Sequence, residues 1–372
     1  MFNKVKGISI LGKFDFVLFI LAAGLAAFGF VVLRSATASM NTGATIVRTQ
    51  LISICLGIAA CIVTSFIDYR FYKILGYIFY AGTLLMLIYV IPFGYGRDVV
   101  GIGSNSWIVA GGFMFQPSEL AKITYMMTIP AVLEKLREEF TFGMFAASAV
   151  LALAPIGLIL MQTDMGTAVV FAVGLVSVLF VYGVRYRYVI SAFVLTAVAA
   201  PLTYYYLLDD YQKTRIKTLL NPLEDVQGAG YQTLKAKIAI GSGGLKGSGL
   251  FQGLQSQQNG AIPVKESDFI FSVIGEELGF IGAVSVILVT TVLLLWCMRV
   301  AIRAKDRYGS MMAAGLTGML AFHFIENIGM NIGIMPVTGI PLPFISAGGS
   351  SMLVNFIAIG LIMSVSLRSK LE

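Results

Sequence analysis

The chain has 372 residues, of which 58% are hydrophobic and 12% charged, and its formal net charge is +7. Soluble domains carry about 25% charged residues, so this composition excludes a water-soluble fold, a disordered chain, a coiled coil and a nucleic-acid-binding protein. The apolar runs are long and do not alternate, which predicts an all-α integral membrane protein rather than a β-barrel. Three cysteines and one histidine give neither a disulfide framework nor a His-rich metal site.

Ten segments are long and apolar enough to cross the hydrocarbon core as helices. A polar segment at 209–268 separates the seventh from the eighth, and three prolines predict a non-helical stretch at 330–349. The chain 1–372 is therefore expected to form a single polytopic membrane domain. The expected spans are 15–33, 49–67, 72–92, 113–133, 144–161, 166–184, 188–208, 269–298, 308–329 and 350–367.

Positive residues are distributed unevenly between the two ends of these spans. With a cytoplasmic N-terminus, the inner side holds fifteen Lys and Arg residues, and the short outer loops hold only Arg34, Arg48 and Arg97. Cytoplasmic loops carry the excess of Lys and Arg in membrane proteins. We therefore expect both termini in the cytoplasm and a large extracytoplasmic loop at 209–268.

The second half of this loop, residues 231–265, contains four lysines, seven glycines and no acidic residue. Lysines and close backbone N–H groups at a membrane surface suit an anion such as a lipid phosphate. A flexible polar connector explains the same composition. Both interpretations stay open at this point.

Glu119 and Lys122 are three residues apart within the fourth expected span, so they share a helix face and can pair. Charges inside a membrane usually face a protein interior or a wet cavity, which favours a functional role. Alternatively, Gln116 is a helix N-cap, Pro117 the first helical residue and Glu119 a first-turn acid. That alternative explains Glu119 but not Lys122.

Asp268 ends the long loop directly before the eighth span. It is either an N-cap residue or a general base at the membrane surface. Glu276 follows eight residues later, about 12 Å along a helix. This exceeds the spacing of paired glycosidase carboxylates, so we expect Glu276 and Glu277 to line an internal polar seam.

Other polar residues have simpler explanations. Asp164 fits a turn or helix cap before Gly166, and Trp107 fits the interfacial aromatic belt. His323 and Glu326 are three residues apart, which favours a satisfied buried hydrogen bond over a proton relay.

Five motifs occur in order along residues 15–367: Gln116–Lys122, Ser267–Phe271, Gly275–Gly279, Pro336–Ser346 and Gly348–Ser351. With them the chain resembles the SEDS family (shape, elongation, division, sporulation). The motif at 336–346 is closer to the elongation branch, RodA, than to the division branch, FtsW. The sequence departs from the usual family pattern at Ser106, Val264 and Ala347, positions expected near the donor diphosphate.

The resemblance implies a peptidoglycan glycosyltransferase of the bacterial inner membrane, with an extracytoplasmic active face. Such an enzyme polymerises lipid II into glycan strands, releases undecaprenyl diphosphate and serves cell elongation and rod shape beside a class B penicillin-binding protein. Asp268 matches the family's catalytic aspartate, and Glu119 and Lys122 match its polar pair.

In the implied reaction Asp268 takes the proton of the acceptor sugar's 4-hydroxyl, and the configuration at the donor carbon inverts. Candidates for neutralising the leaving diphosphate are Lys122, Arg48, Arg215 and Lys237, together with a divalent cation such as Mg²⁺, for which the sequence identifies no ligands. Trp107, Asp164 and Ser346 are further candidates for substrate contacts.

Two other functions stay open. Intramembrane charges and a broken segment at 330–349 also suit a lipid II flippase or secondary transporter. A scaffold that only holds and activates the penicillin-binding partner is the third hypothesis.

Overall fold

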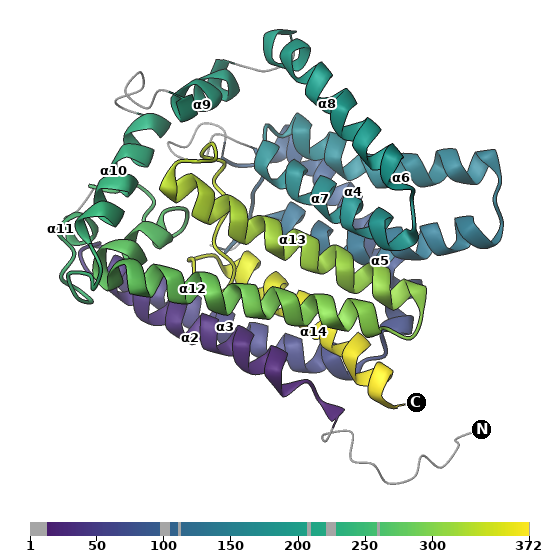
Figure 1. Cartoon of the computed structure of the whole chain (residues 1–372), viewed down its shortest axis with the longest axis horizontal. Coiled ribbons are helices and arrows are strands. Elements are labelled where there is room, and N and C mark those ends of the chain that lie inside the picture. The colour runs from purple at the N-terminus through teal and green to yellow at the C-terminus, as the bar shows by residue number, and fades with distance from the viewer. Residues whose placement is uncertain are drawn as a thin grey trace.

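The computed structural model describes residues 13–96, 105–110, 113–206, 210–220, 228–258 and 261–371, and these form a bundle of long helices (Figure 1). Arg97 and parts of the expected loop at 209–268 lie outside the described residues. A two-stranded hairpin, β1 (Ile108–Ala110) with β2 (Phe113–Phe115), precedes helix α5. The helices are α2 (Phe16–Ala36), α3 (Gly43–Phe66), α4 (Tyr69–Phe93), α5 (Pro117–Glu138), α6 (Phe142–Met161), α7 (Met165–Tyr182), α8 (Tyr186–Tyr206), α9 (Asp210–Leu220), α10 (Ala229–Ser242), α11 (Leu254–Gln257), α12 (Ile270–Arg303), α13 (Arg307–Ile332) and α14 (Gly349–Leu371).

Eight helices in the described chain have the length and hydropathy of a membrane span: α2, α3, α4, α6, α7, α12, α13 and α14. Helices α5 and α8 coincide with the other two expected spans and have 22 and 21 residues, but they are not among the eight. The count of ten therefore stays a prediction. The fourth span was expected to begin at residue 113, which is wrong because residues 113–115 form β2 and the helix begins at Pro117.

Helices α13 and α14 form the interior of the bundle. In their most apolar windows 72% and 83% of residues are buried, against 22% in α3 and α6, so the latter turn most of their surface outward. Helix α14 packs on α3, while α13 packs between α7 and α12. Helix α8 lies at the edge of the bundle (Figure 1). Between α13 and α14 the chain is non-helical over residues 333–348, as the prolines predict.

Helix α12 is broken near its beginning, at Gly279, whose φ of 68° and ψ of −166° are not helical. The backbone of the glycine-rich segment docks on this break: the Ser248 and Gly249 N–H groups donate to the carbonyls of Glu276 and Glu277 at 3.0 and 2.9 Å. A Cβ atom on Gly247 would lie 2.2 Å from the Glu277 carbonyl oxygen. Glycine is therefore required here for close backbone packing, and this part of the loop is not a loose connector.

The seam expected for Glu276 and Glu277 is present, and both side chains are buried. The Glu276 carboxylate accepts the backbone N–H groups of Gln255 and Ser256 at 2.6 and 2.8 Å, in the first turn of α11. Glu277 accepts the Ser35 hydroxyl of α2 at 2.6 Å. These buried carboxylates hold the loop between α10 and α12 against the bundle.

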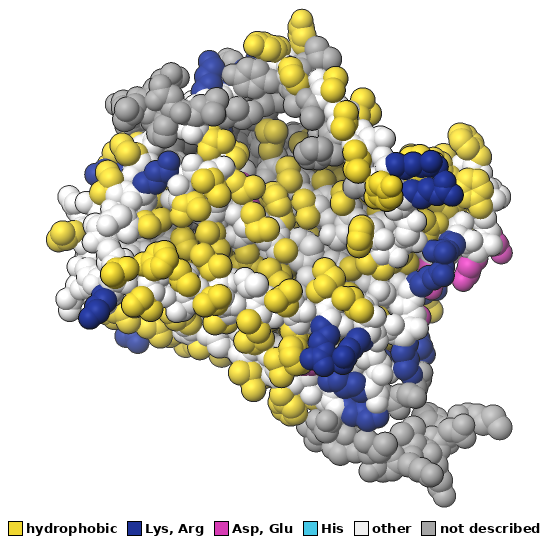
Figure 2. Space-filling model, in the orientation of Figure 1, with side chains coloured by type: hydrophobic (Ala, Val, Ile, Leu, Met, Phe, Trp, Pro, Cys, Tyr) yellow, Lys and Arg dark blue, Asp and Glu magenta, His cyan; other side chains and the backbone are white. Residues whose placement is uncertain are grey.

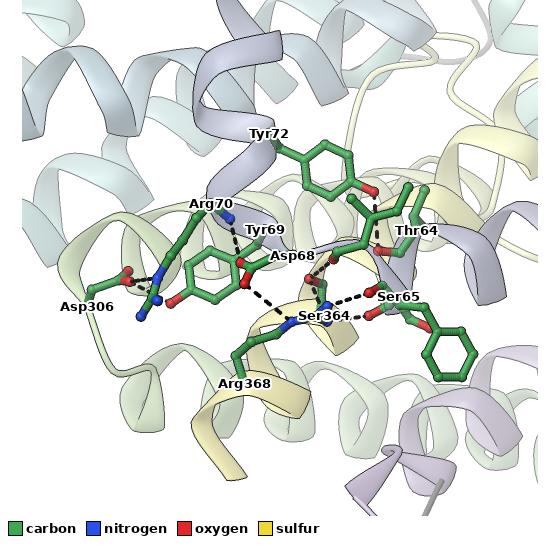
Figure 3. Close-up of polar contacts among 11 residues, drawn as sticks. Thr64, Ser65, Asp68, Tyr69, Arg70, Tyr72, Asp306, Ser364 and Arg368 are labelled. Carbon is green, nitrogen blue, oxygen red and sulfur yellow. Dashed lines mark hydrogen bonds and ion pairs between the residues drawn. The ribbon is translucent and has the colours of Figure 1, made fainter. Parts of the chain in front are cut away.

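At the end of the bundle where the described chain begins and ends, a polar network ties two helix connections to the last turns of α14 (Figure 3). Tyr69 OH and Arg70 Nε donate to Asp306 Oδ2 at 2.5 and 3.4 Å, which joins the α3–α4 turn to the α12–α13 turn. Arg368 of α14 donates to the Ser65 carbonyl at 2.7 Å. Asp306 Oδ1 accepts the Gly309 N–H, so both carboxylate oxygens of Asp306 have partners.

Candidate active site

A polar cavity of about 200 Å³ lies at the opposite end of the bundle, where α5, α7, α12 and α14 begin. The 333–348 segment forms one wall, and α9 contributes another. Its charged and aromatic lining residues are Trp107, Glu119, Asp164, Arg215, Asp268 and His323. Residues more than 200 positions apart in the sequence therefore meet in one site.

Asp268 is presented to the cavity by a tight turn. The Val264 carbonyl accepts the N–H groups of Ser267, Asp268 and Phe269 at 3.1–3.3 Å. Val264 itself has a φ of 53°, a strained conformation for a β-branched residue that is typical of functional sites. The turn fixes the position of the carboxylate.

Two asparagines of α13 hold this turn in place through hydrogen bonds. Asn327 Nδ2 and Asn331 Nδ2 each donate to the Asp268 carbonyl at 2.9 Å. The Asn331 side-chain oxygen accepts the Ser272 N–H at 3.0 Å, in the first turn of α12. The N-cap interpretation of Asp268 is wrong, because Phe269 occupies that position and an asparagine of another helix accepts the first-turn N–H.

Among the described residues, the Asp268 carboxylate has few hydrogen-bond partners. Its Oδ1 accepts the Ser267 hydroxyl at 2.9 Å, and a Cβ on Gly339 would lie 3.5 Å from its Oδ2. Burial raises the pKa of Asp268 to about 6, although the Ser267 hydrogen bond and the Arg215 charge lower it. Such a carboxylate is ionised at neutral pH and is a stronger base than an ordinary aspartate.

Glu119 and Lys122 pair as expected, with 2.8 Å between Lys122 Nζ and Glu119 Oε1. Both are buried, and Lys122 Nζ also lies 3.0 Å from His323 Nε2 of α13. His323 does not pair with Glu326 as expected, since Glu326 accepts the Thr338 hydroxyl at 2.9 Å. Only Glu119 and His323 of the trio line the cavity, so Lys122 acts on it through them.

The predicted cap at Asp164 is present: its Oδ1 accepts the Thr167 N–H at 3.0 Å at the start of α7. Burial raises the pKa of Asp164, and the hydrogen bond to Thr167 lowers it. Gln116 occupies the predicted N-cap position of α5, but its side chain donates to Asp164 Oδ2 at 3.3 Å instead of capping. Asp164 therefore has both the expected capping role and a place in the cavity wall.

Trp107 lines the cavity, beyond its expected place in an aromatic belt, and its backbone pairs with Tyr95. Ser346 does not line it: the buried hydroxyl donates to the Ser267 carbonyl and accepts the Leu342 N–H at 2.8 Å. Ser346 thus supports the Asp268 turn from the 333–348 segment.

The four candidate cations differ in whether they reach the cavity. Arg215 of α9 is the one Lys or Arg that lines the cavity in the described chain. Arg48 is exposed on α3 and does not reach the cavity. Lys237 is also placed elsewhere, on α10 against Gly333 at the end of α13. The three positions that depart from the family pattern, Ser106, Val264 and Ala347, all line the cavity.

Sequence reasoning missed Asn327, Asn331 and Gln50. Gln50 Nε2 donates to the Ser346 carbonyl at 2.9 Å and its Oε1 accepts the Gly348 N–H at 3.2 Å. The available signal was amide residues within or directly after apolar spans, where polar groups normally have partners.

The arrangement can accept a proton at Asp268 and neutralise an anion at Arg215. In the described residues, no three His, Cys, Asp or Glu side chains gather as metal ligands. The donor set of the described residues therefore does not fit a cation held by the protein alone.

Comparison with known proteins extends these observations. The sequence model of the FtsW, RodA and SpoVE cell cycle proteins matches residues 15–371. The chain is 37% identical over 366 residues to a probable peptidoglycan glycosyltransferase FtsW of Geobacter metallireducens, covering 96% of each protein. It is 35% identical over 318 residues to the peptidoglycan glycosyltransferase MrdB of Escherichia coli K12, covering 86% of this chain and 85% of the relative.

Solved structures agree with the sequence relatives. A chain of a peptidoglycan synthase complex that coordinates polymerization and crosslinking superposes with a TM-score of 0.81 at 30% identity, covering 96% of this chain and 98% of that one. The rod shape determining protein RodA of Thermus thermophilus gives a TM-score of 0.69 at 29% identity, covering 95% and 96%. With a family match over nearly its whole length and relatives above 30% identity, the chain belongs to the FtsW, RodA and SpoVE family.

Proposed function

We propose that this protein is a peptidoglycan glycosyltransferase that polymerises lipid II. The observation that carries the proposal is the Asp268 carboxylate, which accepts only the Ser267 hydroxyl among the described residues and is held by its backbone in a cavity beside Arg215. The names of the relatives support the same reaction class.

The proposed step moves one proton and exchanges one bond. Asp268 accepts the proton of the acceptor's 4-hydroxyl, and that oxygen attacks the anomeric carbon of the donor sugar. The bond from this carbon to the lipid diphosphate breaks, a β-1,4 linkage forms and undecaprenyl diphosphate leaves. Because the reacting carbon is attacked from the face opposite the leaving group, its configuration inverts.

The remaining cavity residues position the reactants and balance charge. Arg215 neutralises the leaving diphosphate as negative charge develops on it. Glu119 is anchored by Lys122, and its Oε2 has no hydrogen-bond partner among the described residues, so it can accept a sugar hydroxyl. Positioning of this kind supplies much of the rate in transfer reactions.

The orientation in the membrane, the branch of the family and the partner are proposed from the sequence and its relatives. The positive residues at the end with both termini support a cytoplasmic location for that end and an extracytoplasmic active site in the inner membrane. The form of residues 336–346 supports the elongation branch rather than the division branch. The similarity to a chain of a synthase complex supports a crosslinking partner, a class B penicillin-binding protein.

Purified protein and fluorescent lipid II in detergent test the proposal. We expect polymer without a bilayer and without a partner protein. A flippase would make none, and a scaffold would yield polymer only when an active partner is added. Either of these results would overturn the proposed activity.

A further inference from the structure

A second polar cavity, of about 270 Å³, lies at the end of the bundle that carries both termini. It is formed by the start of α2 and the ends of α12 and α14, far along these helices from the candidate active site. Its polar lining residues are Asp15, Trp296, Arg299, Arg303, Ser366, Ser369 and Lys370.

The single carboxylate in this cavity is already occupied. Asp15 Oδ1 accepts Trp296 Nε1 at 3.0 Å, and its Oδ2 accepts the Ser366 hydroxyl at 2.6 Å. Lys370 Nζ lies 3.5 Å from the same Oδ2. Asp15 thus holds the three helices together and balances the charge of one lysine.

Among the described residues, Arg299 and Arg303 have no carboxylate partner of this kind. They are exposed and four residues apart, so they lie on one face of α12. In the described part of the chain neither is within ion-pair distance of a carboxylate. Figure 2 shows Lys and Arg side chains gathered at this end of the molecule. Two unpaired guanidinium groups beside a cavity form a site for an anion with several oxygen atoms, such as a phosphate.

The surroundings favour a lipid as the source of that phosphate. The Arg299 guanidinium stacks on the Trp296 ring at 4.6 Å, and tryptophan is typical of the membrane–water interface. On the same helix Leu295 and Ile302 are 65% and 77% exposed, so apolar surface adjoins the cations. A headgroup phosphate at the arginines would leave its acyl chains against this surface.

We propose that this cavity binds the phosphate of an anionic phospholipid in the leaflet at the terminal end of the bundle. Arg299 and Arg303 hold the phosphate oxygens, and Trp296 positions Arg299. Basic pockets between transmembrane helices recognise anionic headgroups in this way. Since Asp15 joins α2, α12 and α14 beside the site, a bound lipid stabilises the packing of these helices.

Trp296 provides the readout, because the chain has only two tryptophans. The full chain with Trp107→Phe is placed in phosphatidylcholine nanodiscs that contain either brominated phosphatidylglycerol or brominated phosphatidylcholine. Quenching is expressed relative to the same protein in unbrominated lipid. We expect stronger quenching by the anionic lipid than by phosphatidylcholine. In the double variant Arg299→Gln, Arg303→Gln, this preference for the anionic lipid should fall about fivefold for each arginine removed.

The matched control is Lys135→Gln with Arg185→Gln, which removes two exposed cations from the same end but away from the cavity. It should keep the preference, whereas Arg299→Lys with Arg303→Lys should keep part of it. Equal quenching by the two lipids, or equal loss in the control, overturns the proposal. Elimination of the preference by submillimolar inorganic phosphate would assign the site to a soluble anion and overturn the lipid assignment.

Discussion

The two ends of this helical bundle use carboxylates in opposite ways. At the end with the termini, Asp306 Oδ2 accepts Tyr69 and Arg70, while its Oδ1 accepts the Gly309 N–H at 2.8 Å. At the other end, the Asp268 carboxylate accepts one hydrogen bond from the described residues, from the neighbouring Ser267 hydroxyl, and the residue is held instead through its backbone carbonyl.

The difference separates structural from chemical roles. A carboxylate whose oxygens are saturated by donors is stabilised as a fixed anion and has little capacity to accept another proton. A carboxylate that is positioned through its backbone keeps its oxygens available. Charge alone in an apolar sequence therefore does not identify a catalytic group; the partners of each oxygen do.

The largest expected effect is at Asp268. Asp268→Asn keeps the shape but removes the base, so lipid II polymerisation should fall by about 10²–10⁴-fold. Asp306→Asn, at the other end, should keep the activity per folded molecule while lowering thermal stability. Polymer yield and thermal unfolding of both purified variants check this comparison. Equal activity losses in the two would contradict it.

Arg215 should give the next largest effect. Arg215→Ala removes the cation that lines the cavity, and polymerisation should fall by about 10²-fold. Lys237→Ala removes a cation from the same segment between α8 and α12 but outside the cavity. Its rate should stay within about twofold of the unmodified protein. A larger loss for Lys237→Ala than for Arg215→Ala would show that the cavity is not the site of diphosphate stabilisation.

The pH dependence should be moderate and have a definite sign. Because burial raises the pKa of Asp268 to about 6, the carboxylate becomes protonated below that pH and loses its capacity to accept a proton. The polymerisation rate should fall about tenfold for each pH unit below the pKa and be level above it. Initial rates at saturating lipid II measure this. A rate that rises as the pH falls through 6 would contradict a general base.

The smallest expected effect is structural. Tyr69→Phe removes the hydroxyl that donates to Asp306 at 2.5 Å. The variant should lose about 1 kcal/mol of stability and keep its turnover. Thermal unfolding in detergent, with polymer yield as the control, tests this. A loss of turnover with unchanged stability would mean that the two ends of the bundle are coupled.

Local sequence patterns predicted much of the fold. Long apolar runs predicted the ends of the long helices to within about six residues, and the largest difference is at α3, which begins at Gly43 instead of residue 49. The spacing of Glu119 and Lys122 predicted their pairing, because three residues along a helix fix two side chains on one face. The prolines of 336–343 likewise predicted the non-helical segment before α14.

Tertiary contacts decided what local patterns could not. The break at Gly279 depends on a loop that begins more than 30 residues earlier in the chain. Arg215, rather than Arg48 or Lys237, reaches the cavity because of where α9 lies, which composition does not encode. The contacts of Asn327 with the Asp268 carbonyl span 59 residues of sequence.

The most direct test measures lipid II binding and polymer formation on one preparation of Asp268→Asn. If this carboxylate is the proton acceptor, the variant binds labelled lipid II with nearly unchanged affinity and forms glycan at least about 10²-fold more slowly. Glu139→Gln, which changes an exposed carboxylate at the other end of α5, does both normally. Polymer formation by Asp268→Asn at the rate of the unmodified protein would contradict the account.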